Sequence, residues 1–249
     1  MMELREKIFD SQYFNKRIAS LSNYVIEDEI EIRMNLSEYT KPQLLFYALF
    51  KKYYQLVILE YSRGEDIDKM QKKFIQVIDA YEKNNMCPNH VETIFEEDID
   101  DYVISLWLFS LSILLKQDID ITGRLVNCIG NNGKDILFEG LLSKAYLGNN
   151  MLNAKKIIYP KVYQNLYEIT LSPKEFQPII MIKFLENWYE SMNKCYWHNS
   201  HKGKDGGGFF GYWCWEAAAV TVIYGIDDSL YKNMPYYPKD IVDFYRTTI

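Results

Sequence analysis

Glycine and proline are scarce in this 249-residue sequence, which contains 12 and 7 of them. Because these residues mark turns and interrupt regular elements, their scarcity argues against a loop-rich fold and favours long regular elements. The four cysteines, Cys87, Cys128, Cys195 and Cys214, lie far apart and form no paired spacing. This spacing excludes a disulfide-stapled scaffold and predicts reduced thiols in the cytoplasm.

Long apolar runs are missing as well. The longest, Val103 to Leu115, is interrupted by serines and is shorter than the roughly 20 residues that a membrane-spanning helix needs. The first seven residues have mixed charge and lack the apolar segment of a signal peptide. We therefore expect a cytoplasmic chain that does not bind a membrane.

The sequence also lacks an excess of positive charge. The sequence has 28 Lys and Arg against 34 Asp and Glu, which gives a net charge of −6. Direct binding of DNA, RNA or an anionic membrane relies on basic surface, so these partners are disfavoured. An acidic chain instead suits a basic protein partner, such as the DNA-binding surface of a nuclease.

Apolar residues recur at spacings of three and four almost throughout, and strict alternation is rare. This periodicity predicts an all-α, multi-helical fold of two packed helical halves, with no substantial β-sheet. The expected helices cover residues 4–34, 41–63, 66–81, 102–115, 134–146, 152–169, 173–192, 211–224 and 238–245.

The stretch between Lys116 and Gly133 contains Asp118, Asp120 and the segment Gly-Asn-Asn-Gly at 130–133. Turn-forming residues of this kind favour a domain boundary, although no long flexible linker marks it. We expect an N-terminal helical domain at residues 1–120 and a C-terminal helical domain at residues 121–249.

A cluster of acids precedes the apolar helix expected at 102–115. Acids at a helix start complement the helix dipole, so charge compensation on a solvated face explains the cluster. The same carboxylates are candidates for contact with a basic partner. A second candidate pair, further along the chain, equally suits local capping of the turn that follows it. The candidate contact residues are Glu96, Glu97, Asp98, Asp100 and Asp101 in the cluster, and Asp227 and Asp228 in the pair.

Rare residues concentrate between Trp188 and Trp215, a segment with four of the five tryptophans, two of the three histidines and five of the 12 glycines. Within it, the glycines of residues 206–211 formally match the G-x-G-x-x-G dinucleotide fingerprint. That fingerprint needs a preceding strand, whereas a helix is expected here, and Phe209 and Phe210 occupy the approach to the phosphates. The segment therefore does not predict a nucleotide site.

Cys195, His198, His201 and Cys214 have the side-chain types that bind zinc. The first three are spaced at i, i+3 and i+6, which spans nearly two helical turns and requires the helix to break. Glu216 suits an acid–base role if burial raises its pKa, and it equally suits a structural role that orients the preceding loop, which we favour. A metal-dependent enzyme centred on His198, His201, Cys214 and Glu216 therefore stays an alternative, without a complete catalytic motif or cofactor motif.

Residues 211–219 read Gly-Tyr-Trp-Cys-Trp-Glu-Ala-Ala-Ala and resemble the GYW-x-x-E-A-A signature of the C-terminal domain of PoNi-type immunity proteins. Residues 226–230 together with 237–238 resemble that family's ending, and residues 61–65 resemble a YS-x-G element of its N-terminal domain. Residues 188–189 and 197–201 fall at the family's aromatic and Ser-His positions. The signature residues that we expect to build the fold are Trp188, Trp197, Gly211, Tyr212, Trp213, Trp215, Glu216, Tyr237 and Pro238.

The resemblance implies a helical, cytoplasmic antidote to a PoNe-type DNase, a toxin of polymorphic-toxin systems with a PD-(D/E)xK-like active site. It implies inhibition by tight binding, with no chemistry of the chain's own, no cofactor and no metal. The partner would be the cognate toxin, and an acidic surface would occlude its active site by mimicking DNA phosphates. A helical scaffold that binds another partner is a further alternative, and the oligomeric state is left open.

Overall fold

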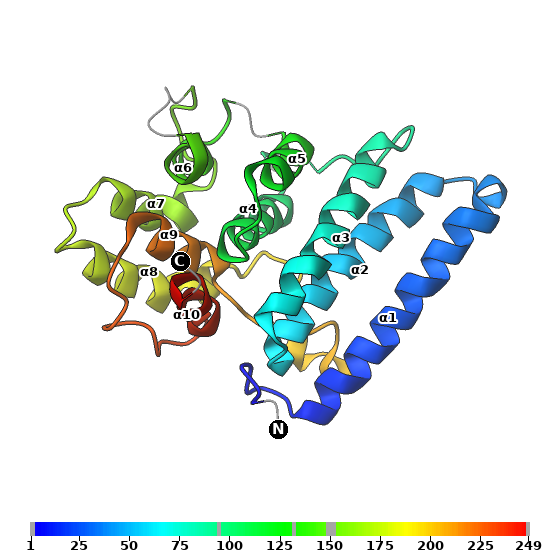
Figure 1. The fold of residues 1–249 in the computed structure, drawn as a ribbon, viewed down its shortest axis with the longest axis horizontal. Coiled ribbons are helices and arrows are strands. Elements are labelled where there is room, and N and C mark those ends of the chain that lie inside the picture. The colour runs from blue at the N-terminus through cyan, green and yellow to red at the C-terminus, as the bar shows by residue number, and fades with distance from the viewer. Residues whose placement is uncertain (1–2, 94–95, 131–132, 148–152, 248–249) are drawn as a thin grey trace. The chain divides into compact units, whose positions relative to one another are not determined.

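The computed structural model describes residues 3–93, 96–130, 133–147 and 153–247. Within these ranges the chain forms ten α-helices and short 3-10 segments, with no β-strand (Figure 1). The all-α fold that the periodicity predicts is therefore confirmed. Over the same residues, no helix combines the length and the hydropathy needed to cross a membrane.

The chain divides into two compact units, and neither is a continuous piece of sequence. Unit 1 comprises Met1–Thr93, Gly123–Cys128 and His201–Tyr212, and unit 2 comprises Ile94–Thr122, Ile129–Ser200 and Trp213–Ile249. No single boundary in the sequence separates these two units. The domain boundary expected between residues 120 and 121 stays a prediction.

Three long helices build most of unit 1. They are α1 (Ser11–Met34), α2 (Pro42–Arg63) and α3 (Ile67–Met86), with the short 3-10 segment η1 (Leu36–Glu38) between α1 and α2. Helix α1 packs against α2, and α2 packs against α3 (Figure 1). The contact face of α1 is apolar at helical spacing, because Phe14, Ile18, Leu21 and Val25 are buried.

The ends of these helices follow from local sequence. Asp10 caps α1, since its carboxylate accepts a hydrogen bond from the Tyr13 backbone N–H at 2.9 Å. Helix α2 ends at Gly64, whose φ of +100° is left-handed. A Cβ at Gly64 would lie 2.1 Å from the Glu3 carbonyl oxygen, so this position requires glycine.

Unit 2 is organised around two buried helices. Its helices are α4 (Ile99–Leu114), α6 (Ile136–Leu142), α7 (Pro160–Leu171), α8 (Gln177–Ser191), α9 (Trp215–Tyr224) and α10 (Lys239–Thr247), while α5 (Ile119–Ile129) carries residues of both units. In α4, every residue of 102–114 is buried, and α9 is buried from Trp215 to Thr221. Helix α9 packs against α4, α7 and α10, which places the core of unit 2 around these two helices.

Helix α8 begins later than the sequence predicts. The expected capping box at 172–175 is wrong, since residues 174–176 form a turn and the helix begins at Gln177. The Gln177 side-chain amide donates to the carbonyl oxygens of Ile169 at 3.0 Å and Ser172 at 3.2 Å. These bonds close the end of α7, so the buried glutamine is used there as a tertiary cap.

Other helix limits differ for similar reasons. Helix α9 begins at Trp215, because residues 211–214 form no regular structure and Cys214 N–H donates to the Tyr236 carbonyl at 2.8 Å. Helix α5 occupies part of the stretch in which the sequence predicts a domain boundary. Of the Gly-Asn-Asn-Gly segment there, Asn131 and Asn132 lie outside the described residues. Residues 148–152, which include the start of the helix expected at 152–169, are also outside them.

Candidate partner-binding site

The acidic cluster Glu96–Asp101 lies at the start of α4 in unit 2. Asp98 is the N-cap of this helix, and its carboxylate accepts a hydrogen bond from the Asp100 N–H at 2.8 Å. The Asp100 carboxylate accepts from the Tyr196 N–H at 3.0 and 3.2 Å and so holds a distant turn against the helix start. These two carboxylates therefore have structural roles.

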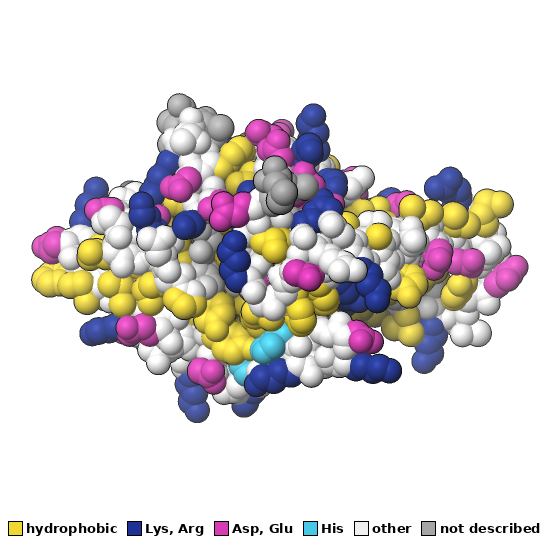
Figure 2. Space-filling model, turned by 90° about the horizontal axis from the view of Figure 1, so that it is seen from below, with side chains coloured by type: hydrophobic (Ala, Val, Ile, Leu, Met, Phe, Trp, Pro, Cys, Tyr) yellow, Lys and Arg dark blue, Asp and Glu magenta, His cyan; other side chains and the backbone are white. Residues whose placement is uncertain are grey.

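The other members of the cluster differ in how much they face solvent. Glu96 lies 3.6 Å from Lys134, and because both side chains are exposed to solvent the pair adds little stability. Asp101 is half-buried and Glu97 is exposed. On the face of the molecule shown in Figure 2, Lys and Arg side chains are interspersed with Asp and Glu. Contact of this cluster with a partner stays a prediction.

The second acidic pair has one exposed and one buried member. The Asp227 carboxylate accepts from the Ser229 N–H at 2.9 Å, which is the local capping that the sequence suits. Asp228 is 5% exposed and accepts hydrogen bonds from Arg246 at 2.6 Å and from the Tyr237 hydroxyl at 3.1 Å. Asp228 therefore ties α10 to the preceding turn, with Pro238 immediately before that helix.

An aromatic centre fills the middle of unit 2. The rings of Trp188 and Trp197 stack with centroids 5.6 Å apart, and Trp107 on α4 lies 5.0 Å from Trp197 and 6.5 Å from Trp188. Trp213 and Trp215 form a further pair at 6.2 Å. The sequence predicts a structural role for the four tryptophans between 188 and 215, but not for Trp107. Trp107 lies in the most apolar of the expected helices, and that position is the signal for a place in the core.

Glu216 joins three helices of this centre. Its Oε1 accepts from Trp188 Nε1–H on α8 at 2.7 Å and from the Tyr163 hydroxyl on α7 at 3.3 Å. The side chain is fully buried, and its Oε2 has no hydrogen-bond partner among the described residues. Burial raises the pKa of Glu216 to about 7, against the opposing effect of these hydrogen bonds. With no exposed surface, this carboxyl is suited to holding helices together.

The glycine-rich segment before Glu216 is bonded into unit 1. The Tyr13 hydroxyl donates to the Phe209 carbonyl at 2.9 Å, and the Ser62 hydroxyl donates to the Phe210 carbonyl at 2.8 Å. Gly206 has a φ of +80°, and a Cβ there would lie 2.5 Å from the Tyr13 ring. The segment therefore needs glycine to pass this ring closely.

Two side chains hold the end of the same segment. Tyr212 N–H donates to Glu6 Oε2 at 3.3 Å, and the Tyr212 hydroxyl shares a hydrogen bond of 2.8 Å with His201 Nδ1. Glu6 and Tyr13 carry no sequence motif, so periodicity alone could not find them. Ser62 lies in the YS-x-G element at residues 61–65, and this element is the sequence signal for its hydrogen bond to Phe210.

The four residues with zinc-ligand types are not assembled into one group. Over the described ranges, no three or more His, Cys, Asp or Glu side chains are placed to hold a metal ion. Burial raises the pKa of both the Cys195 and Cys214 thiols, which keeps them protonated, whereas a nucleophile needs the thiolate.

Two protein-family models together match most of the chain. The family model "PoNe immunity protein (PoNi), N-terminal" matches residues 5–127, and "PoNe immunity proteins (PoNi), C-terminal" matches residues 133–241. The chain belongs to the PoNi family. Comparison with curated proteins found no match.

A solved structure shares the PoNi chain's fold. The crystal structure of protein PA2201 from Pseudomonas aeruginosa matches 99% of this chain and 92% of that chain, with a TM-score of 0.72 and 15% sequence identity. At this identity the likeness shows the fold alone.

The PoNi signature residues are buried, and they divide between the two units. Gly211 and Tyr212 belong to unit 1, and Trp213, Trp215 and Glu216 belong to unit 2. The segment His201–Tyr212 thus lies within the range of the C-terminal family model but is part of unit 1. These residues are buried, and partner contact must be sought among exposed side chains.

Proposed function

We propose that this PoNi chain is the antidote to a PoNe-type DNase toxin and neutralises it by binding, without chemistry of its own. Membership of the PoNe immunity family over both its domains carries the proposal. The net charge of −6 supports it, because a DNase needs a basic surface to hold DNA phosphates. The buried state of Glu216 and Cys214 also supports a role without catalysis.

In this proposal an acidic surface of the antidote occupies the DNA-binding groove of a PD-(D/E)xK-like nuclease. Opposite charges speed the encounter of two proteins and align them before apolar contacts form. Substrate DNA is then excluded because its phosphates and the antidote require the same basic residues. The antidote would act in the cytoplasm, where the DNA that needs protection lies.

Co-expression with the cognate toxin tests the function. Cells that carry the toxin should grow when the chain is present, and the two proteins should purify together from those cells. Failure of both growth rescue and co-purification would contradict the proposal. As a matched control, a PoNi chain with little identity to this one should give no protection if the pairing is specific.

A further inference from the structure

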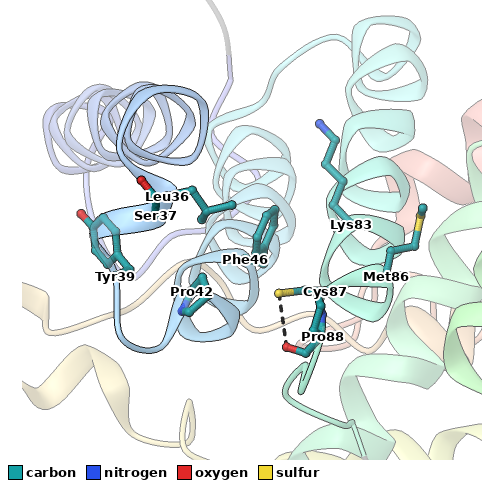
Figure 3. Close-up of a pocket in the computed structure, with 9 residues that line it drawn as sticks. All are labelled: Leu36, Ser37, Tyr39, Pro42, Phe46, Lys83, Met86, Cys87 and Pro88. Atoms are coloured by element: carbon teal, nitrogen blue, oxygen red, sulfur yellow. Dashed lines mark hydrogen bonds between the residues drawn. The ribbon is translucent and has the colours of Figure 1, made fainter.

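An apolar pocket opens in unit 1, where η1, the start of α2 and the end of α3 come together (Figure 3). Its volume is about 790 Å³, within the range of pockets that bind ligands or partner side chains. Seven of its nine lining residues are apolar or aromatic, and among them are Leu36, Pro42, Phe46 and Met86. Lys83 also lines it, and Figure 3 shows its amine pointing away from the apolar residues.

Unit 1 carries exposed apolar side chains both at this pocket and along α1. Met86 is 82% exposed and Tyr39 is 41% exposed, and both line the pocket. Met34, at the end of α1, is 70% exposed. Ile26 and Ile30 are also exposed and precede it at intervals of four residues, so the three form one line along the helix. Exposed apolar side chains at the mouth of an apolar pocket are typical of an interaction site.

The same segment is strongly acidic. Residues 27–38 contain five carboxylates and one arginine, which gives the segment a net charge of −4. Asp28 pairs with Lys52, and Glu29 accepts from the Tyr53 hydroxyl at 2.6 Å, so these two acids fix α1 to α2. Glu27 and Glu38 are exposed to solvent.

Negative charge reaches the rim of the pocket. The Tyr39 hydroxyl donates to Glu31 Oε2 at 3.0 Å. This hydrogen bond is the main cause of a raised pKa at Tyr39, and the charges of Asp28 and Glu38 add to it. A carboxylate therefore lies at the rim beside Tyr39, next to a concavity that suits apolar groups.

We propose that this surface, the apolar pocket with the acidic segment 27–38, docks the toxin, and this rests on the proposed function. The occupant is a basic protein surface that seats an apolar side chain in the pocket between Phe46 and Met86. Lysines or arginines around that side chain face Glu27, Glu31 and Glu38. Anchors in desolvated pockets dominate binding energy, and the surrounding charges set orientation and association rate.

The charges favour a basic partner over a second copy of this chain. In a two-fold symmetric dimer the same surface faces itself, so each acidic segment would approach its own copy. Like charges opposed in this way weaken association. A basic nuclease surface meets the same carboxylates with opposite charge.

Substitution of an exposed pocket residue tests the proposal. The variant Met86→Arg places a cation in the pocket mouth, where it blocks the apolar anchor and repels a basic partner. The matched control is Leu171→Arg in unit 2, because Leu171 is 69% exposed and receives the same change. Both sites face solvent, so both variants should fold, which circular dichroism and thermal melting check.

The probe is the inactivated nuclease domain of the toxin that the wild-type chain neutralises in cells. We expect Met86→Arg to raise the dissociation constant about 30-fold or more, as loss of an interface hot spot does. Leu171→Arg should match the wild type. Equal binding by Met86→Arg overturns the docking site but leaves the function standing, whereas a wild-type chain that binds no toxin overturns the function itself. A wild-type dimer that Met86→Arg converts to monomers in light scattering would also overturn the toxin as occupant.

Discussion

Two acidic segments of this chain have similar composition and different surroundings. In Glu96–Asp101, two of five carboxylates accept backbone hydrogen bonds at the start of α4, and a third lies beside Lys134. In residues 27–38, two carboxylates fix α1 to α2, and Glu27 and Glu38 face solvent. Leu36 and Ser37 of the same segment line an apolar pocket. The density of acids therefore does not distinguish a helix start from a docking surface, but the apolar groups around them do.

Glu216 is a fully buried carboxylate that connects three helices. Its titration should have the largest effect on the free energy of unfolding. Its pKa is raised from 4.5 to about 7, so the folded state keeps the proton while the unfolded state releases it. Stability should therefore fall as pH rises between about 4.5 and 7 and level off above that, by about 3 kcal/mol from this group.

Glu216→Gln separates this effect from other titrations, because the amide oxygen still accepts from Trp188 and the group does not ionise. The difference in free energy of unfolding between the variant and the wild type should change by the same amount across that pH window, as urea titrations at several pH values would measure. A constant difference would show that Glu216 is not the titrating group.

Asp98 and Asp100 should affect stability more than toxin binding. Asp98→Ala removes an N-cap and should destabilise the chain by about 1 kcal/mol. Asp100→Ala leaves the Tyr196 N–H without its acceptor and should cost a similar amount, about 1–2 kcal/mol. Urea unfolding measures both, with Glu97→Ala as the exposed control. Unchanged stability in both variants would show that Asp98 and Asp100 contribute no more to folding than exposed acids do.

The exposed acids of unit 1 should behave in the opposite way. Glu27→Lys/Glu38→Lys should change the free energy of unfolding by no more than about 0.5 kcal/mol, as is usual for surface substitutions. The same variant should slow association with the toxin, and the effect should shrink at high salt because screening weakens it. Stopped-flow binding at two ionic strengths measures this, with Glu175→Lys/Asp243→Lys as a control of equal charge change in unit 2.

Sequence patterns predicted most of the helices but few of the tertiary hydrogen bonds that connect them. Helical periodicity identified the all-α fold, and the residues around Gly211 identified the family. The start of α9 at Trp215 was not predicted, because Cys214 N–H donates to the carbonyl of Tyr236, which is remote in the sequence. The bond from the Gln177 side chain to the end of α7 was not predicted either. The bond between Glu6 and Tyr212 spans 206 positions, which no local pattern reports.

The candidate contact surface was the least predictable feature. Five of the six residues at 96–101 are acidic, whereas only five of the twelve residues at 27–38 are, so the first segment is the more conspicuous in the sequence. The sequence does not show that Ile26, Ile30 and Met34 are exposed, or that a pocket opens between η1, α2 and the end of α3.

Charge reversal of both acidic segments in one binding assay tests the comparison most directly. Glu27→Lys/Glu38→Lys and Glu96→Lys/Glu97→Lys change the net charge equally, so long-range attraction to the toxin falls by the same amount in both. We predict that the first weakens toxin affinity about tenfold more than the second at low salt. An equal loss, or a greater loss for the segment at 96–101, would contradict the assignment of the docking surface to unit 1.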